Sequence, residues 1–217
     1  MTINGIFTDE SGAIKNERAL ESHFLPTYNN QPLKVDYLYN PSHLGGLGDI
    51  VDAVAQGVLD EKSDYDLTNM LSDASQKVAT QKLLLVGHSQ GNFYANNFYE
   101  KVADKEGGVP SESIGVYGVA TPASSVAGGG KYLTSDTDVV ISKVVGRVLN
   151  VLKPNTHITL QNGDDNLGHD FSGVYLKYQG DRIVSDIKSS LNNLKENDEQ
   201  DSAVRAFLRR KLPLGIK

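Results

Sequence analysis

The sequence lacks cysteine and tryptophan among its 217 residues. Disulfides and thiolate metal sites are therefore excluded, although the absence of cysteine leaves the cellular compartment open. The chain also lacks an excess of positive charge, since its formal net charge is -6. We therefore expect no binding to nucleic acid or to an anionic membrane surface, because both need a basic patch.

Long apolar runs are missing as well, so no transmembrane segment is expected. Residues 1–10 (MTINGIFTDE) have neither the basic start nor the apolar run of a secretory signal. We expect a cytoplasmic protein, or a secreted one whose signal has been removed. The composition is that of an ordinary globular chain. It predicts one domain over residues 1–198, followed by a C-terminal tail with a short helix at 199–217.

Strand-like and helix-like segments alternate along the chain, which predicts an α/β fold with a largely parallel sheet. The all-apolar segment Leu83–Val86 is typical of the buried centre of such a sheet. Strands are predicted at residues 3–7, 33–40, 83–86, 113–120, 130–135 and 157–161. Helices are predicted at about residues 13–25, 67–78, 91–102, 139–149, 169–178 and 181–194.

The motif Gly87-His88-Ser89-Gln90-Gly91 lies between a buried strand and a helical pattern. G-x-S-x-G in this context is the nucleophile elbow pattern. A sharp turn lifts the serine Oγ above the sheet edge, and the flanking glycines let two chain segments approach closely. The following helix directs its N-terminal amides and the positive end of its dipole toward a developing oxyanion. The motif therefore predicts that Ser89 is a nucleophile.

The stretch LLLVGHSQGN (83–92) resembles the elbow of α/β-hydrolase fold serine hydrolases, particularly lipases and esterases. The resemblance continues through VYGVATPASSV, YLTSDTDVVI and NLGHDF and covers about residues 2–176 in outline. It implies an α/β-hydrolase fold with a minimal, mostly parallel sheet of about six strands and helices on both faces. The resemblance also leads us to expect that the early strands of larger family members are absent.

A serine nucleophile needs a base, and the base needs an orienting carboxylate. In this family the chain order is serine, acid, histidine. His157 and His169 are the histidines that follow Ser89. His157 lies in a predicted strand, where we expect a structural role, whereas His169 lies in a polar loop after the last strand. We therefore predict that His169 is the base, and that His88 packs and forms hydrogen bonds.

The orienting acid is expected in the loop that contains Asp136 and Asp138. Asp138 begins a D-x-V pattern that resembles the acid loop of many hydrolases, so it is the first choice. Asp136 is the alternative acid if the preceding strand is shorter than predicted. Three further aspartates lie near His169 and are expected to solvate its loop: Asp164, Asp165 and Asp170.

The oxyanion hole requires two backbone N–H groups. One comes from the residue after the nucleophile, here Gln90. The second comes from the loop after an earlier strand, and the resemblance of Asn4-Gly5-Ile6 to that loop makes Ile6 the candidate, with Phe7 as the alternative. Asparagine stands here where relatives often carry histidine.

No cofactor is expected, because water can resolve an acyl-enzyme. No metal is expected either, since the aspartates of residues 134–138 and 162–166 do not match an ordered calcium loop. The apolar segment 139–152 is predicted to be a buried helix, with the lining of an acyl pocket as the alternative.

The leading prediction is a carboxylic ester hydrolase acting on a small ester or a lipid-like substrate. Lactonase, thioesterase and acyltransferase activities would use the same residues. A non-catalytic binding module is the least favoured alternative, because it predicts a missing or misplaced triad residue.

Overall fold

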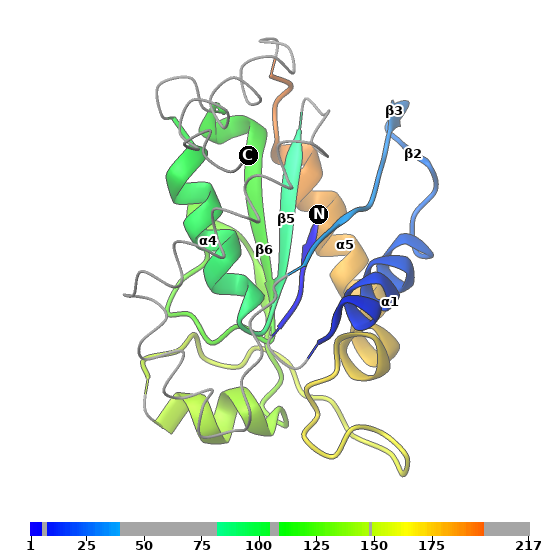
Figure 1. Cartoon of the computed structure of the whole chain (residues 1–217), viewed down its shortest axis with the longest axis vertical. Helices are drawn as coiled ribbons and strands as arrows, with labels where there is room; N and C mark the ends of the chain where they lie inside the picture. The colour runs from blue at the N-terminus through cyan, green and yellow to red at the C-terminus, as the bar shows by residue number, and fades with distance from the viewer. Residues whose placement is uncertain (6–7, 40–81, 105–108, 148, 198–217) are drawn as a thin grey trace, which may run out of the picture.

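The computed structural model of the chain describes residues 1–5, 8–39, 82–104, 109–147 and 149–197, in which strands and helices form an α/β arrangement (Figure 1). The strands are β1 (Thr2–Ile3), β2 (Thr27–Tyr28), β3 (Gln31–Pro32), β4 (Tyr37–Leu38), β5 (Leu83–His88), β6 (Ile114–Val119) and β7 (Tyr132–Leu133). The α-helices are α1 (Glu10–Glu21), α4 (Gly91–Val102) and α5 (Lys177–Asn193). Shorter helical turns are η1 (Ser111–Ser113), η2 (Ala127–Gly129), η3 (Val140–Val144), η4 (Val145–Arg147) and η5 (Phe171–Leu176).

One sheet holds five of the described strands in the order β4-β1-β5-β6-β7, and every neighbouring pair is parallel. Between the two central strands the register runs from Leu83 opposite Ile114 to His88 opposite Val119. The predicted α/β class with a mostly parallel sheet is therefore confirmed. The expected number of about six strands is not reached within the described residues.

The predicted strand at residues 157–161 is wrong. Thr156 forms an isolated bridge with Ser135, and the segment after it has no ladder. Individual hydrogen bonds hold this segment instead, including one from Thr137 Oγ1 to the carbonyl oxygen of Ile158 at 2.8 Å. Because Ile158 is 1% exposed, the apolar alternation of this segment reflects burial and not strand pairing.

Helices cover both faces of the sheet, as predicted (Figure 1). In β5, Leu83 and Leu85 pack in the core cluster that contains the buried face of α4. Leu84 and Val86 point the other way, into the cluster that contains residues of α1, η5 and α5. Burial on both faces explains why this strand is apolar throughout.

The helix that follows the elbow is confirmed. Helix α4 begins at Gly91, and four residues at helical spacing along it are buried: Gly91, Ala95, Phe98 and Val102. Helix α1 starts after Asp9, whose carboxylate accepts a hydrogen bond from the Gly12 amide at 2.7 Å. This N-cap satisfies one of the amides that a helix leaves without an intrahelical partner.

Two predicted helices differ from regular α-helices. In the predicted helix at 139–149, residues 140–147 form the π-helical turn η3 and the 3₁₀ turn η4, with Val140, Ile141 and Val145 buried. Residues 171–176 form the π-helical turn η5, which runs directly into α5. The predicted break between helices 169–178 and 181–194 is therefore a kink at Gln179, where φ is -127°.

A small antiparallel hairpin of β2 and β3 was not predicted. Asn29 and Asn30 form its turn with φ of 49° and 62°. Positive φ at both central residues gives the turn that best suits a two-residue hairpin, and asparagine tolerates it. The Tyr28 hydroxyl donates to Asn192 Oδ1 at 2.9 Å, which joins the hairpin to α5.

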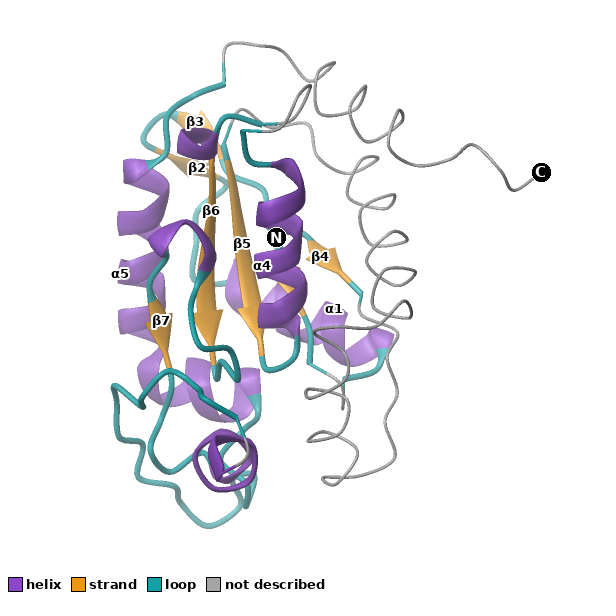
Figure 2. Cartoon of the chain, turned by 90° about the vertical axis from the view of Figure 1, so that its left-hand side faces the viewer, coloured by secondary structure: helices purple, strands orange, loops and turns teal. Residues whose placement is uncertain are grey.

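The strand order reverses between β1 and β5. The chain leaves β1 through α1 toward β4, and it leaves the neighbouring β5 through α4 toward β6 on the other side. The two helices lie on opposite faces, so their starts diverge. In open α/β sheets, ligands bind at the carboxyl ends of the strands beside such a reversal. Figure 2 shows β5 and β6 pointing toward the end of the molecule where loops gather.

Four predicted features lie outside the described residues: Ile6 and Phe7, the helix at 67–78, and the tail at 199–217. Within the described residues, no helix is long and apolar enough to cross a membrane.

Candidate active site

Ser89 lies at the carboxyl end of β5, directly before α4. Its φ of 54° is in the left-handed region, which a non-glycine residue adopts at a strained turn. The flanking glycines are required by close contacts. A Cβ at Gly91 would lie 2.2 Å from the carbonyl oxygen of Ile3, and a Cβ at Gly87 would lie 2.7 Å from Asn92 Cα. The turn is the sharp elbow that the motif predicts.

Asn92 holds the elbow against the neighbouring strand. Its side-chain amide donates to the carbonyl oxygens of Ser89 at 2.8 Å and Val119 at 3.0 Å. The Ser89 amide donates to the same Val119 oxygen at 3.1 Å. The asparagine is 1% exposed, and nothing in the local sequence pattern indicated this role.

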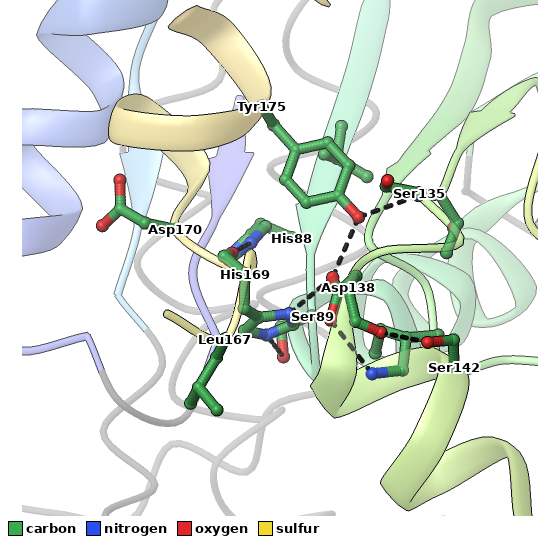
Figure 3. Close-up of polar contacts among 12 residues, drawn as sticks. His88, Ser89, Ser135, Asp138, Ser142, Leu167, His169, Asp170 and Tyr175 are labelled. Atoms are coloured by element: carbon green, nitrogen blue, oxygen red, sulfur yellow. Dashed lines mark hydrogen bonds and ion pairs between the residues drawn. The ribbon is translucent and has the colours of Figure 1, made fainter. Parts of the chain in front are cut away.

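Ser89, His169 and Asp138 form one chain of hydrogen bonds (Figure 3). His169 Nδ1 lies 2.8 Å from Asp138 Oδ2, and His169 Nε2 lies 2.9 Å from Ser89 Oγ. Because a carboxylate only accepts, Nδ1 carries the proton, which leaves Nε2 of the neutral ring to accept from the serine hydroxyl. The three predicted residues therefore meet in the arrangement required of a nucleophile, a base and an orienting acid.

The acid of this group is fully buried, with Asp138 at 0% exposure. Its Oδ1 accepts from the Ile141 amide at 3.1 Å, and its Oδ2 accepts from the Tyr175 hydroxyl at 2.9 Å as well as from His169. These donors compensate the loss of water around the carboxylate. Tyr175 is a residue that the sequence analysis missed, since no motif marks it.

The alternative acid, Asp136, lies against a different histidine. Its Oδ1 is 2.8 Å from His157 Nδ1, and both side chains are more than half exposed, at 56% and 62%. The structure thus brings Asp138, and not Asp136, to His169. It also shows that His157 is an exposed residue outside any strand, which corrects the structural role expected for it inside the sheet.

The loop before His169 is held by two aspartates. Asp165 accepts from the amide of His169 at 2.8 Å, so it fixes the backbone that carries the imidazole. Asp164 forms an ion pair with Lys177 at 2.6 Å. The hydrogen bond from Lys177, with a smaller effect from that of Tyr178, lowers the pKa of Asp164 to about 2. Both carboxylates order the loop, whereas the sequence suggested only that they solvate it.

Asp170 is not a partner of the imidazole. Its side chain caps η5 by accepting from the Gly173 amide. Figure 3 shows its carboxylate pointing away from Ser89 and Asp138.

His88 packs behind the site. Its Nε2–H donates to the carbonyl oxygen of His169 at 2.9 Å, and its ring lies 5.0 Å from the ring of His169 and 5.4 Å from that of Phe171. Burial, followed by the proximity of His169, lowers the pKa of His88 to about 4. His88 is therefore neutral at pH 7, with contacts of the packing and hydrogen-bonding kind that the sequence predicts.

Gly5 follows β1 and lies directly against the predicted nucleophile. A Cβ at this position would be 2.6 Å from Ser89 Cβ and 3.1 Å from Ser89 Oγ. The Asn4 side chain donates to the carbonyl oxygens of Gly5 at 3.0 Å and Thr8 at 3.2 Å. The sequence analysis linked Asn4-Gly5 to the oxyanion hole, but it did not predict the close contact between Gly5 and Ser89.

Gln90 directly precedes the first residue of α4, so its amide lies at the positive end of the helix beside Ser89. This is the position predicted for one oxyanion donor. The other candidate, Ile6, lies outside the described residues. In the described part of the chain, no three His, Asp or Glu side chains gather as metal ligands would.

No family model, curated protein or solved structure matches this chain.

Proposed function

We propose that this chain is a serine hydrolase of the α/β-hydrolase type that cleaves carboxylic esters. The observation that carries the proposal is the buried hydrogen-bond chain from Ser89 through His169 to Asp138, at the carboxyl edge of a parallel sheet. Residues from three separate segments meet there, and the strained φ of Ser89 supports a catalytic use of the turn.

In the proposed reaction, Ser89 Oγ attacks the ester carbonyl carbon while His169 Nε2 takes the hydroxyl proton. Asp138 keeps the imidazole in the required tautomer and stabilises the imidazolium that forms. The negative charge moves to the carbonyl oxygen, which we place against the backbone N–H groups of Gln90 and Ile6.

The intermediate then collapses. The carbon–oxygen bond to the leaving alcohol breaks, and His169 returns the proton to the alkoxide, which leaves an acyl group on Ser89. Water attacks this ester with His169 again as base, and the carboxylic acid departs as Ser89 regains its proton. The cycle consumes one water and needs no cofactor.

The test compares wild type with Ser89→Ala on p-nitrophenyl esters of short, medium and long acyl chains. We expect turnover by wild type and none above background by Ser89→Ala, with both proteins folded by circular dichroism. The chain-length profile separates an esterase from a lipase, and an added alcohol acceptor detects acyl transfer. Equal rates for the two proteins would contradict the proposal.

A further inference from the structure

Tyr175 connects the acid of the site to the segment that carries the base. It lies on η5, six residues after His169, and its side chain is fully buried. The hydroxyl donates to Asp138 Oδ2 at 2.9 Å, the same oxygen that accepts from His169 Nδ1 at 2.8 Å. Figure 3 shows the phenol directed at the carboxylate from the side of η5.

The direction of this hydrogen bond is determined by a second contact. The amide of Ser135 donates to the Tyr175 oxygen at 3.0 Å. An amide N–H can only donate, so the tyrosine oxygen accepts there and its own proton is directed to Asp138. Burial raises the pKa of Tyr175, which keeps the hydroxyl protonated and therefore a donor.

These contacts restrict the carboxylate at both oxygens. The Ile141 amide donates to Oδ1 at 3.1 Å, and the Tyr175 hydroxyl donates to Oδ2 at 2.9 Å. A carboxylate held at both oxygens cannot rotate away from the imidazole. Hydrogen bonds to charged groups are also the strong ones, and buried networks of them are coupled.

We propose that Tyr175 is a positioning residue of the Ser89 site, which holds Asp138 in the orientation that lets it direct His169. The inference rests on the proposed function. The segment η5 therefore begins directly after the loop of the base and also carries the tyrosine that aligns the acid. Its π-helical turn places Tyr175 over Asp138.

Tyr175→Phe removes the hydroxyl and keeps the ring. We expect kcat on a p-nitrophenyl ester to fall roughly 10- to 100-fold with KM nearly unchanged, because the lost bond aligns the acid and does not bind substrate. The matched control is Tyr117→Phe. Tyr117 is also fully buried, and its hydroxyl donates to the carboxylate of Asp186 at 3.4 Å, away from the triad. This control should keep kcat within about twofold of wild type.

A double-mutant cycle tests whether the effect passes through the acid. In an Asp138→Ala background, Tyr175→Phe should lower kcat no further, since the group that it positions is absent. A loss of the same size in both backgrounds, or an equal loss in Tyr117→Phe, would overturn the positioning role and indicate a general packing effect.

Proton NMR gives a readout that does not depend on turnover. The downfield resonance of the His169 Nδ1 proton, assigned by its disappearance in His169→Gln, should shift in Tyr175→Phe because Oδ2 loses a competing donor. It should stay in place in Tyr117→Phe. If wild type hydrolyses no ester, the proposed function fails, and the NMR shift still decides the role of Tyr175. An unchanged resonance in Tyr175→Phe would refute it.

Discussion

Two aspartates of one loop pair with two different histidines, at the same contact distance and in different surroundings. Asp138 and His169 meet at 2.8 Å with side-chain exposures of 0% and 10%, and Asp136 and His157 meet at 2.8 Å with exposures of 56% and 62%. Only the first pair continues to a serine, through His169 Nε2. The distance between a carboxylate and an imidazole therefore does not distinguish the two pairs. Burial and a third partner distinguish them.

The largest expected effect comes from removing the charge of each acid in turn. Asp138→Asn should lower kcat/KM on an ester by about 10⁴-fold, because the imidazole then adopts the wrong tautomer and loses a charge that stabilises the imidazolium. Asp136→Asn should leave kcat/KM within about twofold, since this carboxylate is exposed and pairs with His157 and not with His169. Steady-state kinetics of the two variants measure the difference, and equal losses would remove the distinction between the pairs.

The next largest effect is expected from filling the space beside Ser89, the serine that contacts the buried pair. Gly5→Ala places a methyl group 2.6 Å from Ser89 Cβ, so the elbow must shift. Displacing a reacting group by about 1 Å costs on the order of 100-fold in rate, and we expect a loss of that size in kcat/KM.

The control for this variant is Gly180→Ala. Its new Cβ would lie 3.4 Å from the nearest atom, His23 Cε1, which is an ordinary contact. The activity of Gly180→Ala should match wild type. A fully active Gly5→Ala would show that the region beside Ser89 is wider than the structure indicates.

Burial should also appear in the pH dependence of stability. The pKa of His88 is lowered from 6.5 to about 4 in the folded protein. As pH falls below 6.5, the unfolded chain protonates His88 while the folded protein does not, so the unfolding free energy decreases until the pH reaches about 4. This contribution of His88 to stability is fully present above pH 6.5 and amounts to about 3 kcal/mol.

Urea unfolding of wild type and His88→Gln between pH 7 and pH 4 measures this contribution. Glutamine keeps an N–H donor for the carbonyl oxygen of His169 but does not titrate, so its stability should decrease less steeply with acid. Identical slopes for wild type and His88→Gln would contradict the assignment.

The smallest effect is expected at the exposed pair itself. Asp136→Ala breaks the contact with His157, and surface ion pairs contribute under about 1 kcal/mol. The unfolding free energy of this variant at pH 7 should therefore stay within about 1 kcal/mol of wild type. A larger loss would mean that the pair supports the neighbouring Asp138 loop.

Local pattern was sufficient for the features that depend on neighbours in the chain. The strand Leu83–His88, the elbow at Ser89 and the inner face of α4 follow from a run of apolar residues, flanking glycines and helical spacing. Chain order and loop composition pointed to His169 over His157.

Long-range contacts decided the rest, and sequence pattern does not encode them directly. Asp136 and Asp138 are two residues apart and chemically identical. The D-x-V pattern favoured Asp138, and the contacts with His157 and His169 decide between the two. Tyr175 lies 37 residues from Asp138 on a segment without a motif. The alternation at residues 157–161 predicts a strand that the structure lacks, because a partly buried irregular segment can show the same pattern as a half-buried strand.

The central claim is that Ser89 is a nucleophile activated by His169, and covalent labelling tests it most directly. Wild type, Ser89→Ala and His169→Gln would be treated with a fluorophosphonate and followed by intact-protein mass spectrometry. The account predicts one adduct on wild type, located at Ser89 by peptide mapping, none on Ser89→Ala, and labelling of His169→Gln slowed by at least about 10³-fold. Folded wild type that stays unlabelled, or that is labelled at a residue other than Ser89, would contradict it.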